Sequence, residues 1–216
     1  MKLHLGCGER YLEGYLNVDF PAGFHTVQKH SPADLHADIL SLQYPCGSID
    51  EIRLHHVFEH FTRPVACALL ASWHSWLKVG GVLHLEVPDF ARSAVTILNP
   101  LSPAGAKTVA MRHLFGSHEA SWAVHCEGYT REMLKAQLVE FGFEVFENRC
   151  NSWMGTYNFE ILARKISNIV SADGFKSIAR DHLRHFLLDV TQESALLDTW
   201  MEIFELQLQK SMSTDD

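Results

Sequence analysis

Two glycines and a carboxylate near the amino terminus have the types and spacing of a ligand-binding turn. Gly6 and Gly8 follow the apolar segment 2–5, and Asp19 ends the next apolar run, 16–19. A glycine turn lets backbone N–H groups approach a ligand, and a carboxylate ending the neighbouring strand can accept hydrogen bonds from ribose hydroxyls. The third glycine of a dinucleotide fingerprint is missing, so a tight turn without a ligand stays open as an alternative.

A second candidate site lies in a histidine-rich stretch. His56-Val-Phe-Glu59-His60 matches the H-x-x-E-H pattern, in which two histidines on one helix hold zinc and the glutamate activates water. Segment 49–57, however, has the apolar spacing of a strand, which would send the two histidines in different directions. A zinc hydrolase is therefore the less favoured alternative, and no metal ligands are predicted.

The elements that must position these residues alternate between strands and helices. Strands are expected at 2–5, 16–20, 35–40, 49–57, 82–87, 144–148 and 159–164. Helices are expected at about 63–77 and 130–141. This order predicts a doubly wound, mostly parallel α/β sheet of the seven-stranded type, with helices on both faces and an antiparallel closing strand. Few residues separate Gly8 from Leu16, so the first crossover must be a turn or a very short helix.

Two further regions extend this core. Residues 91–129 are interrupted by prolines and glycines and are interpreted as an inserted, irregular lid. Beyond residue 165 apolar stripes recur at helical spacing. We therefore expect a main domain over 1–165 and a helical extension over 166–216, whose stripes pack on the domain, on a second copy in a homodimer, or on a partner protein.

Composition narrows the class of protein. A chain of 216 residues with 47% hydrophobic and 20% charged residues is typical of one globular domain. A net charge of −8 disfavours nucleic acid as a substrate, because such binding needs a basic face. No apolar run is long enough for a membrane span, and the amino terminus does not resemble a signal peptide, so a cytoplasmic protein is expected. The 5 cysteines are scattered and favour reduced thiols.

Several motifs, taken in order, resemble one family. They occupy 3–8, 14–19, 37–39, 48–52, 55–60, 77–81, 87–90, 125–130 and 138–143. In sequence and order they resemble the class I S-adenosylmethionine-dependent methyltransferases of the type 11 group, over about residues 3–164. The resemblance implies S-adenosyl-L-methionine as cofactor and a Rossmann-like fold. The Asn-Val-Asp and Pro-Asp-Phe motifs further resemble enzymes of saccharide or surface-polysaccharide pathways, which makes a small molecule the expected acceptor.

The resemblance also implies roles for individual residues. The turn Gly6, Cys7 and Gly8 would pass under the methionine part of the cofactor, and Asp19 would bind the ribose. The other expected cofactor contacts are Phe20, Asp38, Ile39, His55 and His56, with Asp38 and Ile39 at the adenine. Arg10 stands where the family often has a small residue, and it could pair with the methionine carboxylate.

The acceptor side is expected to be built from the irregular segment. Trp122, Tyr129 and Arg112 are candidate substrate contacts, and His125 or His60 is the candidate base that removes the acceptor's proton. For His125 a hydrogen-bonded loop histidine is an equally weighted alternative. For the whole chain, the alternative to catalysis is a cofactor-binding or degenerate member of the fold that acts as a partner protein.

Overall fold

The computed structural model describes residues 1–21, 23, 30–167 and 171–212. Its centre is a sheet with the strand order β3-β2-β1-β4-β5-β7-β6. The strands are β1 (Lys2–Leu5), β2 (Leu16–Asp19), β3 (Leu35–His36), β4 (Ile49–His55), β5 (Leu77–Pro88), β6 (Phe143–Trp153) and β7 (Thr156–Lys165). β1 to β5 are mutually parallel, whereas β7 runs antiparallel to both β5 and β6. The predicted fold class and antiparallel closing strand are confirmed.

The helices fill the connections and the carboxyl-terminal region. They are α1 (Arg63–Trp76), α2 (Phe90–Leu98), α3 (Ala104–Phe115), α4 (Arg131–Glu140), α5 (Ala172–Arg184) and α6 (Ser194–Ser211). Short 3₁₀ helices in the described part of the chain include η2 (Ile39–Ser41), η3 (Phe58–His60) and η4 (Ser121–Ala123). None of the described helices is long and apolar enough to cross a membrane.

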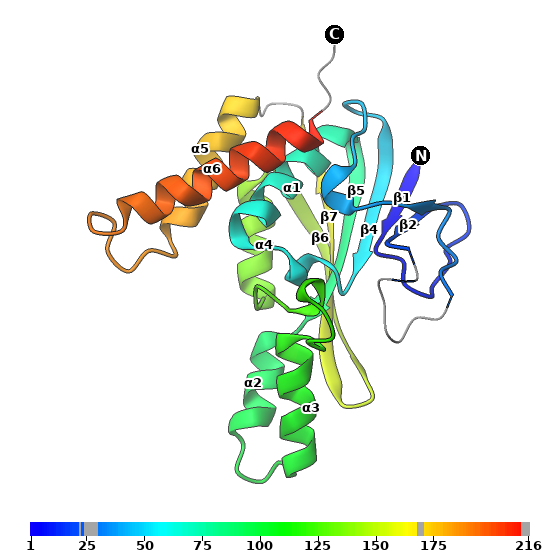
Figure 1. Ribbon diagram of the computed structural model, residues 1–216, viewed down its shortest axis with the longest axis vertical. Helices are drawn as coiled ribbons and strands as arrows, with labels where there is room; N and C mark the ends of the chain where they lie inside the picture. Colours follow the sequence, from blue (N-terminus) through cyan, green and yellow to red (C-terminus); the bar gives the residue numbers. More distant parts are fainter. Residues whose placement is uncertain (22, 24–29, 168–170, 213–216) are drawn as a thin grey trace.

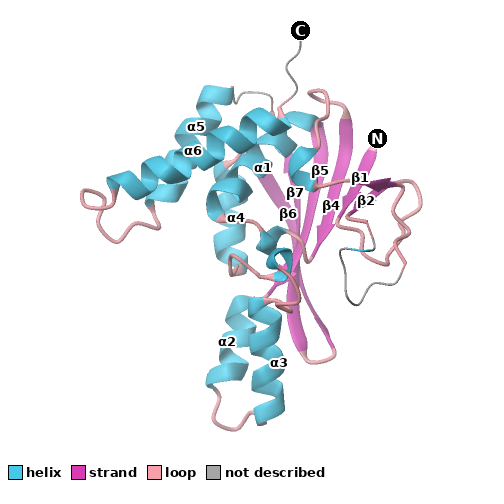
Figure 2. Cartoon of the chain, viewed as in Figure 1, coloured by secondary structure: helices cyan, strands magenta, loops and turns pink. Residues whose placement is uncertain are grey.

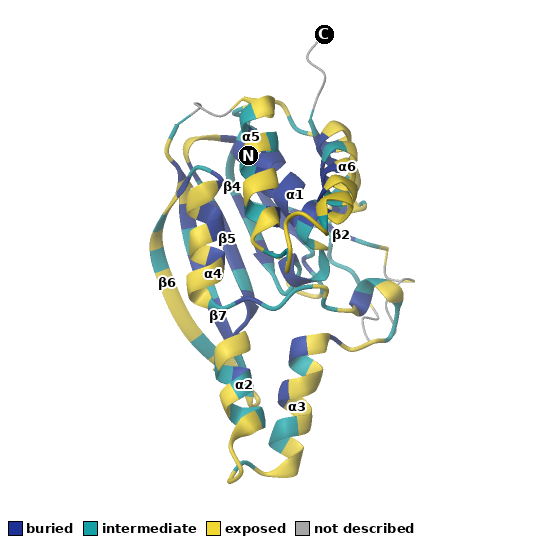
Figure 3. Ribbon diagram, turned by 90° about the vertical axis from the view of Figure 1, so that its left-hand side faces the viewer, coloured by how far each residue is buried: buried dark blue, intermediate teal, exposed yellow. Residues whose placement is uncertain are grey.

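The core lies on one face of the sheet. In β4, Ile52 and Leu54 are fully buried, while the intervening Arg53 is only partly buried, as alternation along a strand requires. Figures 1 and 3 show α1, α4, α5 and α6 on the same side of the sheet. The central helix, α1, is buried along most of its length and carries Trp73 and Trp76 into this core.

The opposite face departs from the expectation of helices on both faces. Among the described residues, no helix packs along it, because the connection from β1 to β2 is a turn and gives no crossover helix. Polar side chains that pair with one another occupy this face instead. Arg53 Nε donates to His55 Nε2 at 2.8 Å, and His84 Nε2 lies 3.1 Å from Glu160 Oε2. Because these polar side chains satisfy one another, they can occupy a sheet face that no described helix covers.

The segment expected to be an irregular lid is mostly helical. α2 and α3 form a hairpin that projects beyond the body of the sheet beside the tip of the β6–β7 hairpin (Figure 1). Asp89 caps α2 by accepting a hydrogen bond from Arg92 N at 3.0 Å, and α3 ends at Gly116 with a φ of +88°. Pro100 lies in the turn after α2, and Pro103 directly precedes α3. The two prolines therefore mark the boundaries of these helices.

The carboxyl-terminal helices pack on the same domain. Trp76 Nε1 of α1 donates to Ser211 O of α6 at 3.1 Å, and Phe204 of α6 is fully buried. The expected helical extension is therefore present as two helices, of which α5 ends at Arg184 and α6 begins at Ser194. Leu206 on α6 is exposed, so contact with a second copy or a partner protein stays a prediction.

Candidate active site

The carboxyl ends of the parallel strands meet at one edge of the sheet, where ligands bind in folds of this type. A cavity of about 470 Å³ opens there. Its lining includes Gly6, Gly8, Asp19, Phe20, Asp38 and Ile39. These residues come from the ends of β1 and β2 and from η2, so the structure brings most of the predicted cofactor contacts to one cavity.

The turn after β1 requires glycine for two different reasons. Gly6 has a φ of +67°, and a Cβ on it would lie 2.3 Å from Val57 Cγ2. Gly8 has a φ of +57°, but no other atom lies within 4 Å of where its Cβ would be. The N–H groups of Gly6 and Cys7 donate to Val18 O at 2.9 and 3.1 Å, which fixes the turn against β2. The backbone is consequently bare where it borders the cavity.

Cys7 lines the turn from the inside. Its side chain is buried, and burial together with the charge of Asp19 raises the pKa of the thiol to about 12. A thiol with such a pKa is a poor nucleophile at neutral pH. Cys7 therefore fills space inside the turn.

Asp19 is held by the backbone of the glycine turn. Gly8 N donates to Oδ2 at 2.5 Å, and Phe20 N donates to Oδ1 at 2.7 Å. These two backbone donors fix the orientation of the carboxylate. The side chain is largely buried and borders the cavity, which are suitable properties for a ribose ligand.

Asp38 and Ile39 line the same cavity at η2. Asp38 Oδ1 accepts a hydrogen bond from Leu40 N at 2.9 Å, which caps this short helix, and Ile39 is buried beside it. A carboxylate and an apolar side chain side by side can meet the amino group and the face of a purine. The glycine turn, the two carboxylates and this apolar wall therefore fit S-adenosylmethionine.

A second cavity, of about 650 Å³, shares part of its wall with the first. His55 and His56, at the end of β4, line both. Most residues that line the second cavity are polar, but the exposed side chains of Val109 and Trp153 add apolar surface. Its lining also includes Arg10, Arg112, Asn151 and His125. Of these, the sequence analysis had singled out Arg112 and His125 for the acceptor.

His56 occupies an unusual position in the shared wall. Its φ is +55°, and its ring lies between two carboxylates: Nδ1 is 3.4 Å from Glu59 Oε1 and Nε2 is 3.0 Å from Glu86 Oε1. Burial lowers the pKa of His56, but its ion-pair contacts with Glu59 and Glu86 outweigh burial and raise it to about 10. By contrast, burial lowers the pKa of the neighbouring His55 to about 3. The shared wall thus combines a charged and a neutral imidazole.

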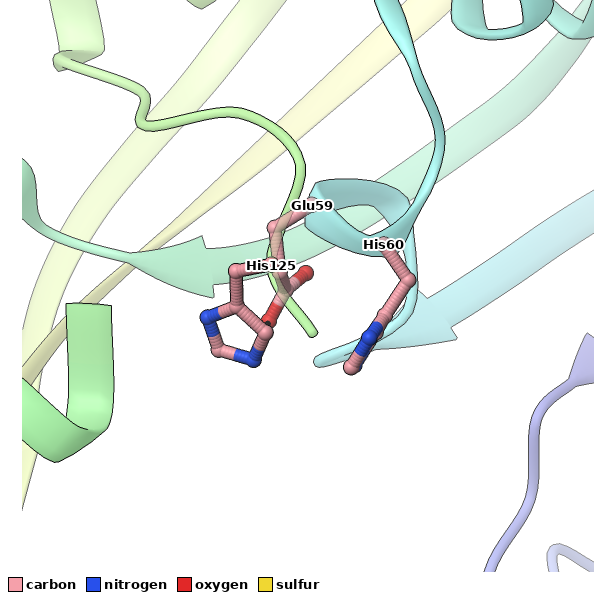
Figure 4. A group of neighbouring side chains, drawn as sticks. All are labelled: Glu59, His60 and His125. Atoms are coloured by element: carbon pink, nitrogen blue, oxygen red, sulfur yellow. Dashed lines mark ion pairs between the residues drawn. The ribbon is translucent and has the colours of Figure 1, made fainter. Parts of the chain in front are cut away.

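Glu59, His60 and His125 form a cluster beside this wall (Figure 4). His125 Nε2 lies 3.9 Å from Glu59 Oε1, and the rings of His60 and His125 are 4.6 Å apart between centroids. Burial lowers the pKa of His125 to about 4, so its imidazole is neutral at pH 7. Both candidate bases therefore lie close together, with His60 facing the first cavity and His125 the second.

The H-x-x-E-H pattern does not form the helix that a zinc protease needs. β4 ends at His55, His56 has a left-handed backbone, and only Phe58–His60 forms a single 3₁₀ turn. His56 pairs with Glu59 and Glu86, whereas His60 lies against His125. The predicted divergence of His56 and His60 follows from this break in the backbone.

The remaining predicted substrate contacts are divided. Trp122 lines the first cavity and Arg112, on α3, lines the second. Tyr129 lines neither of these two cavities, because its ring is buried and stacks on Phe58 with 5.4 Å between centroids. Its place in the core explains why it borders neither.

Several groups in the second cavity were not predicted from the sequence, among them Glu86, Asn151 and Trp153. Glu86 accepts a hydrogen bond from Asn151 Nδ2 at 2.9 Å, and Trp153 lies near the tip of the β6–β7 hairpin. Glu86 had a detectable signal, since it comes shortly before the end of a strand whose carboxyl end faces the cavities. Asn151 and Trp153 had none, because their approach depends on how far β6 extends beyond its predicted end.

The strand order, with antiparallel β7 between β5 and β6 and a glycine turn after β1, defines the fold of the class I S-adenosylmethionine-dependent methyltransferases. A Methanosarcina mazei S-adenosylmethionine-dependent methyltransferase is similar at 16% identity, with a TM-score of 0.50 over 76% of this chain and 92% of that one. Burkholderia thailandensis 1,6-didemethyltoxoflavin-N1-methyltransferase, solved with 1,6-didemethyltoxoflavin and S-adenosylhomocysteine, is similar at 14% identity, with a TM-score of 0.52 over 77% and 71%.

A third similar structure is a chain of the Haloferax volcanii complex between the Trm112 methyltransferase activator and a methyltransferase. It is 12% identical, with a TM-score of 0.54 over 79% of this chain and 83% of that one. No protein-family model and no curated protein matches the sequence. At these identities the likeness establishes the fold, and the chemistry must be argued from the site.

Proposed function

We propose that this protein is an S-adenosylmethionine-dependent methyltransferase that acts on a small polar acceptor. One observation carries the proposal: the glycine turn, Asp19 and Asp38 border one cavity that shares the wall of His55 and His56 with a second, polar cavity. Methyl transfer needs this arrangement, because donor and acceptor must approach in line from two sides.

The cofactor, when bound, supplies a methyl group attached to a positively charged sulfur. A lone pair on an acceptor oxygen or nitrogen attacks the methyl carbon while the carbon–sulfur bond breaks, and the acceptor loses its proton. Asp19 and Asp38 would hold the nucleoside, and the bare backbone at Gly8 would let the methionine part approach. The residues of the chain thus contribute orientation first and proton removal second.

The second cavity favours a hydroxylated acceptor, such as a saccharide or a surface-polysaccharide precursor. Asn151 offers amide groups, Arg112 offers guanidinium donors, and the exposed ring of Trp153 offers an apolar face. Such a mixture matches the alternating polar edges and apolar faces of a sugar ring. Because Arg112 comes from α3, we assign the α2–α3 hairpin the role of the lid over the acceptor.

We assign the removal of the acceptor's proton to the imidazole of His60 or His125. Both are candidate proton acceptors because they lie together at the boundary of the two cavities. Replacing each by Ala is expected to slow methyl transfer from labelled cofactor into an acceptor found by screening sugar and small-molecule extracts. Unchanged rates in both variants would remove these histidines from the reaction.

Calorimetric titration with S-adenosylmethionine and S-adenosylhomocysteine tests the cofactor assignment directly. The wild type should bind both. Asp19→Asn should weaken binding by about 10- to 100-fold, the usual worth of a hydrogen bond to a charged group. Asp198→Asn, which touches only the surface pair of Asp198 with Arg180, is the matched control and should bind as the wild type does. No affinity for either compound in the wild type would refute the proposal.

A further inference from the structure

We propose that Glu59, His60 and His125 bind a divalent transition-metal ion where the two cavities meet. The site itself is argued from these side chains and their surroundings alone. Its role in catalysis rests on the methyl transfer proposed above. Figure 4 shows the three side chains close together, with Glu59 and His60 on η3 and His125 on the loop that follows η4.

The geometry of the donor atoms is the first argument. One ligand atom from each of the three residues can be chosen so that all lie within 4.8 Å of one another. In a tetrahedral site with ligands at about 2.0–2.1 Å, donor atoms are roughly 3.3 Å apart. The cluster would therefore need to contract by about 1 Å or more, which side-chain rotation can provide.

The backbone already holds the two segments together. Glu59 O accepts hydrogen bonds from Cys126 N at 2.8 Å and Glu127 N at 3.2 Å, and His125 N donates to Phe115 O at 3.2 Å. The loop that carries His125 is thus fastened to the residue that supplies the carboxylate. A pre-formed frame of this kind lowers the entropy that a metal ion must overcome when it collects ligands from distant segments.

His60 has the environment of a metal ligand. Its Nδ1 lies 3.2 Å from Val124 O, so Nδ1–H can donate to this carbonyl. That hydrogen bond selects the tautomer in which Nε2 carries the lone pair. Metal-bound histidines are commonly oriented in the same way, by a backbone carbonyl or carboxylate on the other ring nitrogen.

The carboxylate of Glu59 is the second, independent observation. Its side chain is only 1% exposed, and neither oxygen has a hydrogen-bond donor within the described structure. The charged ring of His56 lies 3.4 Å away but also faces Glu86. A buried carboxylate without hydrogen bonds is costly, and a cation between it and the two imidazoles would compensate its charge.

The donor set defines the chemical class of the ion. Two imidazoles and one carboxylate suit Zn²⁺, Co²⁺, Mn²⁺ or Fe²⁺. His125 contributes a ring nitrogen, and its Nε2 lies 3.9 Å from Glu59 Oε1. This ligand set differs from the H-x-x-E-H pattern, since Glu59 would be a ligand and His56 would not.

In methyl transfer the ion would activate the acceptor. An acceptor hydroxyl bound in an open coordination position would lose its proton to water, because a metal ion lowers the pKa of a bound oxygen. With the ion bound, His60 and His125 would act as its ligands, so water would replace these imidazoles as the proton acceptor. The resulting alkoxide would attack the methyl carbon, so that the oxygen–carbon bond forms, the carbon–sulfur bond breaks, and S-adenosylhomocysteine leaves. This mechanism favours hydroxylated acceptors, especially those with two adjacent oxygens that can chelate the ion.

Titration of the metal-free full chain with Co²⁺ tests the site. We expect one equivalent to bind and to produce the visible absorption of Co²⁺ in a nitrogen and oxygen ligand field. Zn²⁺ should displace it. Glu59→Gln and His125→Ala should each weaken binding by at least about 100-fold, because even second-sphere changes cost 10- to 100-fold. His118→Asn is the control and should bind normally, since His118 is exposed and Asn tolerates its left-handed backbone.

Folding and cofactor binding are monitored in the same samples. Circular dichroism and S-adenosylmethionine titration identify a variant that has lost Co²⁺ only because it is unfolded, and His60→Ala then replaces it. A wild type without stoichiometric Co²⁺ binding, or folded variants that bind as tightly as the wild type, would overturn the metal site. Neither outcome affects the cofactor assignment. A wild type that does not bind S-adenosylmethionine would refute the proposed function but not the metal site.

Discussion

His56 Nε2 lies 3.0 Å from Glu86 Oε1, at the point where the neighbouring parallel strands β4 and β5 come to an end. Burial would raise the pKa of Glu86, but its contacts with His56 and His55 lower it to about 2. The pKa of His56 is raised to about 10 in the same contact. An ion pair is therefore built into the wall between the two cavities.

This ion pair predicts an unusual titration of His56. Its ring-proton NMR signal, assigned by comparison with His56→Gln, should not shift between about pH 6 and 8, the range in which an ordinary histidine titrates. Because the folded pKa exceeds the unfolded one, the stabilisation is complete below about pH 6.5 and is lost as the pH rises through about 10. Glu86→Gln should lower the midpoint. A midpoint near 6.5 in the wild type would contradict the ion pair.

Buried neutral histidines predict the opposite behaviour in acid. Burial lowers the pKa of His74 to about 4, and its ring packs edge-on against Phe143 and Phe175. The unfolded chain therefore binds more protons, so stability should fall as the pH drops from about 6.5 towards 4. In urea unfolding, His74→Phe should reduce the loss of stability between pH 7 and 4.5 by about 2 kcal/mol.

The exposed residue His118 provides the comparison for this experiment. His118→Asn should leave the difference between the two pH values as it is in the wild type. If His74→Phe loses as much stability in acid as the wild type, the buried ring of His74 does not contribute to acid sensitivity.

The glycine turn predicts a difference between two alanine substitutions. Gly6 and Gly47 have φ values of +67° and +63°, but only at Gly6 would the Cβ collide with Val57. Gly47→Ala should therefore cost about 1 kcal/mol of backbone strain, while Gly6→Ala should cost more and abolish cofactor binding. Urea unfolding and cofactor titration measure both effects. Equal losses in the two variants would show that the contact with Val57 is unimportant.

The packing of α6 predicts that the carboxyl-terminal helix stabilises the main domain. Trp76→Phe removes the hydrogen bond to Ser211 O and replaces the two-ring indole with a single aromatic ring. The buried carbonyl then loses its donor, which should lower the free energy of unfolding by about 1–3 kcal/mol. Trp200→Phe, at a partly buried position on α6, is the comparison and should cost less. Hydrogen exchange of α6 amides should also become faster in Trp76→Phe, and unaltered exchange would contradict the prediction.

The parts of the candidate cofactor site that depend on local sequence patterns could be predicted from the sequence. The turn at Gly6 and Gly8 and the strand ending at Asp19 follow from residue types and spacing, whereas Asp38 was implied by the family resemblance. The strand order then brings them to one cavity. Their roles in binding stay predictions. The α2–α3 hairpin was missed because its prolines were interpreted as interruptions, although they end and begin helices.

The contacts of Glu59 could not be predicted in the same way. Its approach to His125 depends on a loop fastened by hydrogen bonds to the Glu59 carbonyl, and no local pattern encodes such a contact. The bare face of the sheet is a similar case. The short connection after β1 was anticipated, but the sequence did not reveal that no helix within the described ranges covers this face.

The wall of His55 and His56 is common to both cavities, and this has a thermodynamic consequence. A compound that enters one chamber alters the electrostatic field and the freedom of side chains that the other compound meets. Thermodynamic linkage makes such an effect mutual. If the first compound raises the affinity for the second by some factor, the second raises the affinity for the first by the same factor. The affinity measured for each compound alone will therefore differ from its affinity when the other compound is bound.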